Sequence, residues 1–300
     1  MPLHPAVQAG WDRARATGFV GYAAMPVAEA RAHFSAVSRL LPPGPDMPVD
    51  DLAIPVAGGA IAARLYRPDG ARGLCVYFHG GGWVLGRLAD FDALCRELAR
   101  RSGVAVLSVD YRLAPEHPFP VPVEDALAAV RWASAHTPVP AGIAVAGDSA
   151  GGNLATVAAL ALRGEIALKA QLLFNPCTDA DLARPSYATY GTGYLLSLAD
   201  VRWFLSLYAP GANPEDMRLA PLRTPDLTGA PPAWIGVAEH DVLRDEDEAY
   251  AAALASAGVP VTCRLVPGVM HAFARGYATV APSDAAVSEA AAFPRAAMAG

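Results

Sequence analysis

From residue 74 onward, short apolar runs alternate with longer segments in which apolar residues recur at helical spacing. The short runs are continuously apolar, which is typical of parallel strands buried on both faces. We expect strands at residues 74–78, 104–109, 143–146, 172–174, 233–238 and 261–266. Helices are expected at residues 91–101, 123–136, 150–162, 246–257 and 283–297. The pattern predicts an α/β fold with a mostly parallel, doubly wound sheet covered by helices.

Two segments do not follow this alternation. Residues 1–45 contain two helix-like stretches, at 6–17 and 26–40, and are followed by a predicted hairpin, 52–56 and 60–66, with two glycines in its turn. Between residues 178 and 232 there is no strand-like run, only an aromatic helix-like segment at 200–208. Insertions of this size are often functional lids. We therefore expect N-terminal helices over 1–45 and a main domain over 46–300 with an insertion at about 180–220.

Composition narrows the classes of protein. The chain has 300 residues, of which 53% are hydrophobic and 17% charged, so it can bury the core of one large domain. Its formal charge of −6 argues against a nucleic-acid partner. No long uncharged stretch predicts a membrane span or a secretion signal, so we expect a cytoplasmic protein. The four cysteines are far apart, which fits small buried side chains better than disulfides or metal ligands.

The sharpest chemical signal is Gly147-Asp148-Ser149-Ala150-Gly151, which matches G-x-S-x-G. It lies between the strand expected at 143–146 and the helix expected from 150. Glycines on either side of the serine permit a turn that is too tight for a β-carbon, and the turn projects the Ser149 hydroxyl above the sheet edge. This position favours a nucleophile over an ordinary turn.

A second signal, His79-Gly80-Gly81-Gly82-Trp83, directly follows the strand expected at 74–78. Successive glycines leave backbone N–H groups unobstructed, as acyl transfer requires where a carbonyl oxygen becomes an oxyanion. We assign Gly81, Gly82 and Ala150 as the oxyanion donors. Flexible-loop glycines are the alternative.

A serine nucleophile needs a base, and in this fold the chain order is serine, acid, histidine. Only His240 and His271 follow Ser149. With His271 as the base, Asp241 lies just beyond the preceding strand and supplies the acid, whereas His240 would need an acid from the insertion. We therefore predict the triad Ser149, Asp241 and His271.

Together these residues resemble a known family. The segments His79–Gly82, Tyr111–Glu116, Gly147–Asn153 and Asp241–Glu246 are similar to the hormone-sensitive-lipase-like branch of the α/β-hydrolases, the bacterial family IV esterases. The resemblance implies an eight-stranded sheet, a helical cap, hydrolysis of carboxylic esters without a cofactor, and possible dimerisation through an edge strand or the cap. Two positions depart from the family pattern: Val242 replaces a proline, and Ala272 replaces a glycine.

Aromatic residues are candidates for a substrate pocket under the cap. We select Trp83, Tyr190, Tyr194 and Trp203. Because Trp203 and Phe204 are adjacent on a helix, at most one of them faces the substrate. An apolar pocket favours neutral esters with short or medium acyl chains.

The sequence thus predicts a serine carboxylesterase that forms an acyl-enzyme. An amidase or deacetylase with the same triad is one alternative, and a noncatalytic relative that binds a small ligand is another. His271 argues against the latter, because such relatives lack the triad histidine. A nucleotide site is disfavoured, since no G-x-G-x-x-G follows a strand.

Overall fold

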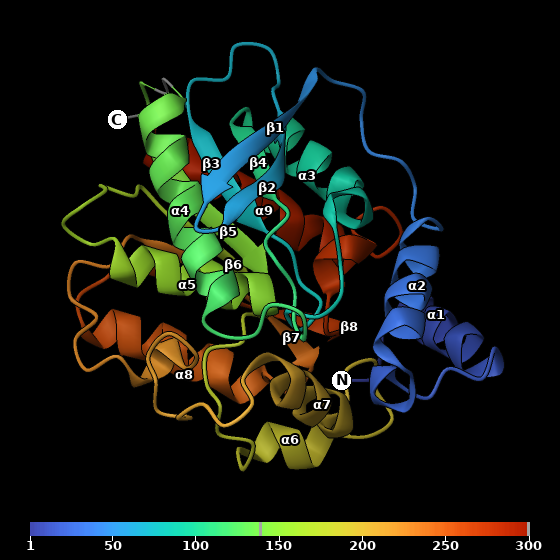
Figure 1. Cartoon of the computed structure of the whole chain (residues 1–300). Helices are drawn as coiled ribbons and strands as arrows, with labels where there is room; N and C mark the ends of the chain where they lie inside the picture. Colours follow the sequence, from blue (N-terminus) through green and yellow to red (C-terminus); the bar gives the residue numbers. More distant parts are fainter. Residues whose placement is uncertain (138–139, 299–300) are drawn as a thin grey trace.

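An eight-stranded sheet forms the centre of the computed structural model, which describes residues 1–137 and 140–298 (Figure 1). The strand order is β1-β2-β4-β3-β5-β6-β7-β8, with antiparallel pairing of β1 with β2 and of β2 with β4, and parallel pairing elsewhere. The strands are β1 (Val49–Val56), β2 (Gly59–Tyr66), β3 (Leu74–Phe78), β4 (Ala105–Val109), β5 (Ile143–Asp148), β6 (Gln171–Phe174), β7 (Ala233–His240) and β8 (Val261–Met270). The mostly parallel, eight-stranded sheet is confirmed.

Helices cover both faces of the sheet. Helices α3 and α9 contact each other on one face, and α4 and α5 contact each other on the opposite face (Figure 1). Every residue of β3 to β7 is buried, as the continuous apolar runs indicated. The helices are α1 (Pro5–Ala16), α2 (Val27–Ser38), α3 (Leu88–Ser102), α4 (Val121–His136), α5 (Ala150–Ala161), α6 (Pro185–Tyr190), α7 (Leu198–Tyr208), α8 (Arg244–Ser256) and α9 (Ala281–Ala297).

Several strands continue past the apolar run that predicts them. Strand β5 ends at Asp148, β7 at His240 and β8 at Met270. The ladder is built from backbone N–H and C=O groups, so it can continue beyond the apolar run, as it does through Asp148 in β5 and through Glu239 and His240 in β7. Because β3, β5, β6, β7 and β8 are parallel neighbours, the loops that follow them meet at one edge of the sheet.

The N-terminal helices pack against the insertion that carries α6 and α7 (Figure 1). Trp11 Nε1 donates a 2.8 Å hydrogen bond to the carbonyl of Gly193, and the N–H of Ala23 donates to Asp200 Oδ1 at 2.9 Å. Asp200 also forms the capping box of α7 with Ser197. Two regions that are far apart in sequence therefore form one layer over the sheet edge. Helix α6 was not predicted.

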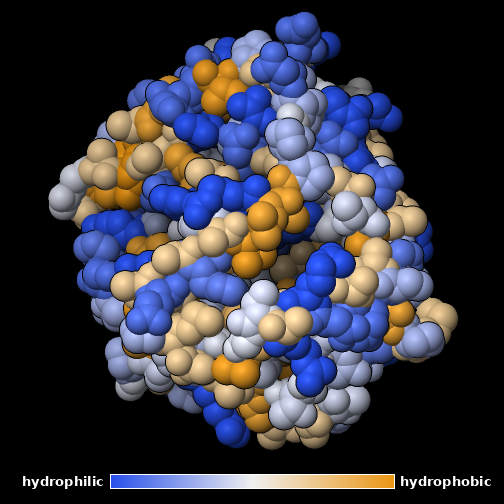
Figure 2. Space-filling model, turned by 90° about the vertical axis from the view of Figure 1, so that its right-hand side faces the viewer, coloured by the Kyte–Doolittle hydropathy of each residue, from blue (hydrophilic) through white to orange (hydrophobic). Residues whose placement is uncertain are grey.

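Figure 2 shows the face that carries the N-terminal helices, where an apolar patch and hydrophilic side chains border a small hollow. Within residues 1–137 and 140–298, no helix has both the length and the apolar character needed to cross a membrane.

All four cysteines are free thiols. Three are buried as expected, but Cys263 is exposed because it lies on the edge strand β8, which has a neighbour on one side only.

Candidate active site

Ser149 occupies a strained turn between β5 and α5. Its φ is 55° and its ψ is −121°, a backbone conformation that residues with a side chain rarely adopt. A β-carbon on Gly147 would overlap the carbonyl oxygen of Gly151, and one on Gly151 would overlap the carbonyl oxygen of Phe78. Only glycines allow the helix to start so close to the sheet, and this tight turn directs the serine side chain to the sheet edge.

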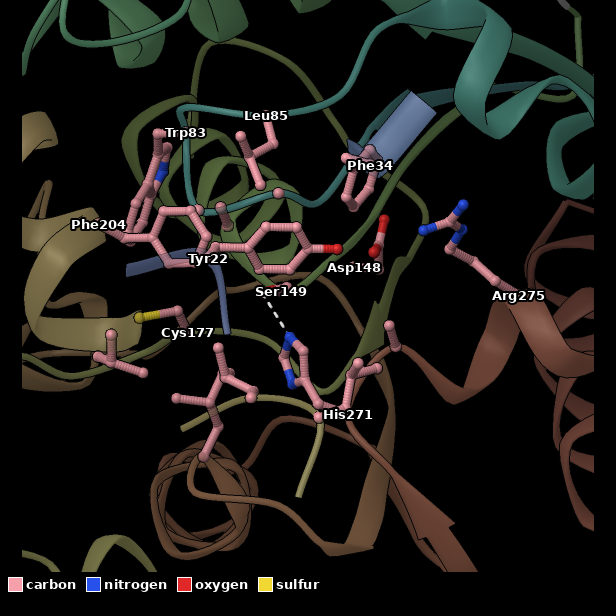
Figure 3. Close-up of a pocket in the computed structure, with 18 of the residues that line it drawn as sticks. Tyr22, Phe34, Trp83, Leu85, Asp148, Ser149, Cys177, Phe204, His271 and Arg275 are labelled. Atoms are coloured by element: carbon pink, nitrogen blue, oxygen red, sulfur yellow. Dashed lines mark hydrogen bonds between the residues drawn. The ribbon is translucent and has the colours of Figure 1, made fainter. Parts of the chain in front are cut away.

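The structure brings Ser149, His271 and Asp241 together. Ser149 Oγ lies 2.8 Å from His271 Nε2, and His271 Nδ1 lies 2.7 Å from Asp241 Oδ2 (Figure 3). The Asp241 carboxylate is only 1% exposed, and its second oxygen accepts a hydrogen bond from the N–H of Leu243. An ionised carboxylate can only accept hydrogen bonds, so the imidazole proton lies on Nδ1. Nε2 is then left to accept the proton of the serine hydroxyl.

Gly81, Gly82 and Ala150 line the same cavity as Ser149. Within the described part of the chain, none of their backbone N–H groups donates a hydrogen bond to another protein atom. The glycine loop is held by a hydrogen bond from the N–H of Leu85 to the carbonyl of Gly81. Ala150 also begins α5, whose dipole favours negative charge at this point.

Asp148 supports this loop from beneath. Its Oδ1 accepts hydrogen bonds from the Tyr77 hydroxyl at 2.6 Å and from the N–H of Gly80 at 2.8 Å. Burial raises the pKa of Asp148, while its hydrogen bond from Tyr77 opposes this rise. His79 is stacked on Tyr111 at 4.4 Å, which fixes the start of the loop. Both residues therefore help to position the glycine loop.

The Ser149 hydroxyl opens into a small cavity of about 130 Å³. Its walls are mainly apolar, and they include Tyr22, Phe34, Trp83, Leu85, Phe204 and Leu205. Figure 3 shows Trp83 and Phe204 on one side of Ser149 and Phe34 on the other.

Of the four aromatic residues selected for the pocket, only Trp83 lines this cavity; within residues 1–137 and 140–298, Tyr190, Tyr194 and Trp203 do not. Tyr190 and Tyr194 instead pack around His240, with Tyr194 stacked on its ring at 5.4 Å. Adjacent helical residues face different directions, and on α7 the inward one is Phe204. The prediction is therefore wrong for Tyr190, Tyr194 and Trp203. The rotation of α7 and the path of the insertion decide which side chains reach the cavity.

Other wall residues were missed by the sequence analysis. Tyr22 and Phe34 come from the N-terminal segment, and Arg275 follows His271 by four positions. Burial raises the pKa of Tyr22 to about 12, so this hydroxyl is neutral in the cavity wall. No local pattern marks these residues, since they reach the cavity only through the packing of distant segments.

Arg31 on α2 ties the N-terminal segment to the main domain. Its guanidinium forms a 2.6 Å ion pair with Glu116 and donates hydrogen bonds to the carbonyls of Val84 and Ala114. The hydrogen bond from Arg31 lowers the pKa of Glu116 to about 2. These contacts place α2 directly beside the loop that follows Gly82.

Comparisons with known proteins agree with this geometry. Residues 75–275 match the model of a family described by the alpha/beta hydrolase fold. The chain is 43% identical to the carboxylic ester hydrolase LipN of Mycobacterium tuberculosis over 90% of this chain and 77% of the relative. It is 40% identical to an ethyl acetate hydrolase of Pseudomonas putida over 87% of each chain.

A solved structure of a thermostable carboxylesterase from a metagenomic library is similar as well. Its TM-score is 0.88 at 38% identity, and the match covers 92% of this chain and 99% of the other. An ester hydrolase from the metagenome of Lake Arreo gives a TM-score of 0.93 at 37% identity, with 98% of each chain covered. With the family match, the fold and the sequence segments in agreement, the chain belongs to the hormone-sensitive-lipase-like branch of the α/β-hydrolases.

Proposed function

We propose that this protein is a serine carboxylesterase in which Ser149 is the nucleophile, His271 the general base and Asp241 the acid that orients it. The proposal rests on one observation: the 2.8 Å and 2.7 Å contacts that link these side chains end at a cavity lined by Gly81, Gly82 and Ala150. This arrangement meets the requirements for nucleophilic catalysis at a carbonyl carbon.

The reaction proceeds in two half-reactions. His271 Nε2 takes the proton of the Ser149 hydroxyl as Oγ attacks the ester carbonyl, and the carbonyl oxygen becomes an oxyanion that accepts hydrogen bonds from Gly81, Gly82 and Ala150. The imidazolium is stabilised by Asp241, and it then protonates the departing alcohol as the carbon–oxygen bond breaks. Water repeats the sequence on the acyl-enzyme, which releases the acid and restores the serine.

The size and polarity of the cavity favour esters with short chains. Its volume of about 130 Å³ is small, and Leu85, Phe204 and Leu205 give it apolar walls. A short acyl or alkyl chain gains by leaving water there, whereas a longer chain extends beyond this volume. The name of the Pseudomonas putida relative, an ethyl acetate hydrolase, agrees with this size class.

Replacing Ser149 by alanine tests the mechanism. Hydrolysis of p-nitrophenyl butanoate by Ser149→Ala should fall to the background rate while the circular dichroism spectrum and the unfolding midpoint stay close to those of the parent. A fluorophosphonate should label the parent at Ser149 and leave the variant unlabelled. Substantial residual turnover would contradict the assignment of the nucleophile.

A matched pair of substrates separates the esterase from the amidase alternative. An ester and an anilide of the same acyl group are hydrolysed by the same triad, but the anilide needs protonation of a poorer leaving group. We expect kcat/KM for the ester to exceed that for the anilide. The reverse order would favour an amidase.

Two further expectations stay proposals. We propose a cytoplasmic location, where the four thiols would remain reduced, and cell fractionation with an antibody tests it.

We also propose that the protein forms a homodimer. Light scattering coupled to size-exclusion chromatography measures its mass directly. A mass of 31.1 kDa would identify a monomer and contradict this expectation.

A further inference from the structure

A positively charged side chain reaches the mainly apolar cavity. Arg275 lies in a short 3₁₀-helix, Phe273–Gly276, four residues after His271, and its side chain lines the cavity. Figure 3 shows its guanidinium directed back toward the cavity from the side opposite Phe204. The proposed mechanism gives this residue no role.

Arg275 is held in place by neutral groups. Its guanidinium carbon lies 4.7 Å from the ring centre of Phe34 and 5.0 Å from that of Phe91. Nη2 donates a hydrogen bond of 2.5 Å to Ser38 Oγ. The side chain is therefore fixed by two aromatic faces and one hydroxyl.

Part of the hydrogen-bonding capacity of this guanidinium has no protein partner. Arginine carries five N–H donors, and Nε is fully enclosed here, which leaves Nη1 as the donor that can reach a bound molecule. Within residues 1–137 and 140–298, no carboxylate forms an ion pair with Arg275. Arg275 is half-buried, and its Nη1 has no protein acceptor in the described part of the chain. An oxygen atom of a molecule bound in the cavity can accept a hydrogen bond from this donor.

The nearby carboxylate determines which kind of acceptor fits. Asp148 faces the cavity from the same side as Arg275 (Figure 3). A substrate carboxylate bound by Arg275 would therefore lie beside the carboxyl group of Asp148 in a mainly apolar cavity. A carbonyl oxygen accepts a hydrogen bond there without placing two acids side by side.

We propose that Arg275 is a specificity-determining residue that binds a second, uncharged carbonyl oxygen of the substrate. The proposal rests on the esterase function given above and adds the substrate class: esters that carry an oxo group in the acyl or the alcohol part, a few bonds from the carbonyl that Ser149 attacks. Phe34 and Phe91 keep the guanidinium in the orientation that this contact needs.

Matched esters test the proposal. In the acyl series, methyl pentanoate is compared with methyl 4-oxopentanoate, and in the alcohol series butyl acetate is compared with 3-oxobutyl acetate. Proton release at constant pH gives kcat/KM for each ester. We expect the ratio of oxo ester to plain ester to be about 10 or more in at least one series, because hydrogen bonds to charged groups are among the stronger ones. The change should appear mainly in KM.

Variants connect this ratio to Arg275. Arg275→Met keeps a long side chain between the two phenylalanines but removes the donors, and it should bring the ratio close to the intrinsic reactivity ratio measured with hydroxide. Arg275→Lys retains a charge and a donor and should preserve part of the preference. Arg131→Met is the matched control, since Arg131 lies on α4 and pairs with Glu165 at the surface. Its ratio should equal that of the parent.

Each outcome decides one question. If the parent shows no oxo preference in either series, or if Arg275→Met retains the preference, the proposal is overturned. A preference for monomethyl glutarate over methyl hexanoate, without one for the oxo esters, also overturns it because the bound group would then be an anion. If Arg275→Met does not fold, the ratios of the parent and of Arg275→Lys still decide. Failure of the parent to hydrolyse any of these esters would instead contradict the esterase function.

Discussion

Replacing Asp241 by asparagine separates the position of this residue from its charge. The Asp241 carboxylate accepts two hydrogen bonds, from His271 at 2.7 Å and from the N–H of Leu243 at 3.1 Å. An asparagine has one acceptor oxygen and one donor nitrogen, so it cannot accept both. If its oxygen faces Leu243, its amide N–H₂ faces His271 Nδ1, which must then lose its proton. The proton moves to Nε2, and this nitrogen can no longer accept the proton of Ser149.

The opposite orientation of the asparagine is unfavourable in this buried site. It would place the N–H₂ group against the N–H of Leu243, and an unmet buried donor costs about 1–3 kcal/mol. The inactive tautomer is therefore favoured by roughly 5- to 150-fold. Loss of the negative charge beside the imidazolium adds to this effect. We expect kcat for Asp241→Asn to fall by about 10³- to 10⁴-fold, as for the same change in serine proteases.

The assay is hydrolysis of p-nitrophenyl butanoate, with urea unfolding of the same samples to show that the variant is folded. Glu248→Gln is the matched control, because this acid lies at the surface and pairs with Arg244. It should retain the activity of the parent. If folded Asp241→Asn loses less than about tenfold in kcat, the tautomer argument is refuted and another group must orient His271.

Two further predictions concern the cavity and the N-terminal helices. Phe204→Ala should enlarge the cavity and raise the hexanoate-to-acetate ratio of kcat/KM by at least about fourfold, which corresponds to one buried methylene. It should also lower the free energy of unfolding by about 3–5 kcal/mol. An unchanged ratio would show that Phe204 does not limit chain length. Glu116→Gln should remove up to about 1 kcal/mol at pH 7, because Glu116 is half exposed. Since Arg31 lowers the pKa of folded Glu116 from 4.5 to about 2, this stabilisation is present above pH 4.5 and is lost as the pH falls toward 2. Urea unfolding at pH 7 and pH 3 measures it, and an equal loss at both values would contradict the ion-pair explanation.

The sequence alone was sufficient for the features that depend on local chemistry. Continuous apolar runs identified the central strands because each of these strands is buried on both faces. The glycines around Ser149 identified the turn, since no other residue fits beside the carbonyls of Phe78 and Gly151. The order of Ser149, Asp241 and His271 along the chain then gave the side chains that the sheet brings together. Their catalytic roles remain to be tested.

Tertiary structure alone decided the shape and the polarity of the cavity. Tyr22 and Phe34 reach it because the N-terminal helices fold over the sheet edge, and Phe204 faces it in place of Trp203 because of the rotation of α7. The position of Arg275 between two distant phenylalanines has no signature near His271 in the sequence. A local pattern records the conformation that its own residues require. The walls of a cavity instead depend on the packing of segments that are hundreds of residues apart, and only the folded chain brings those segments together.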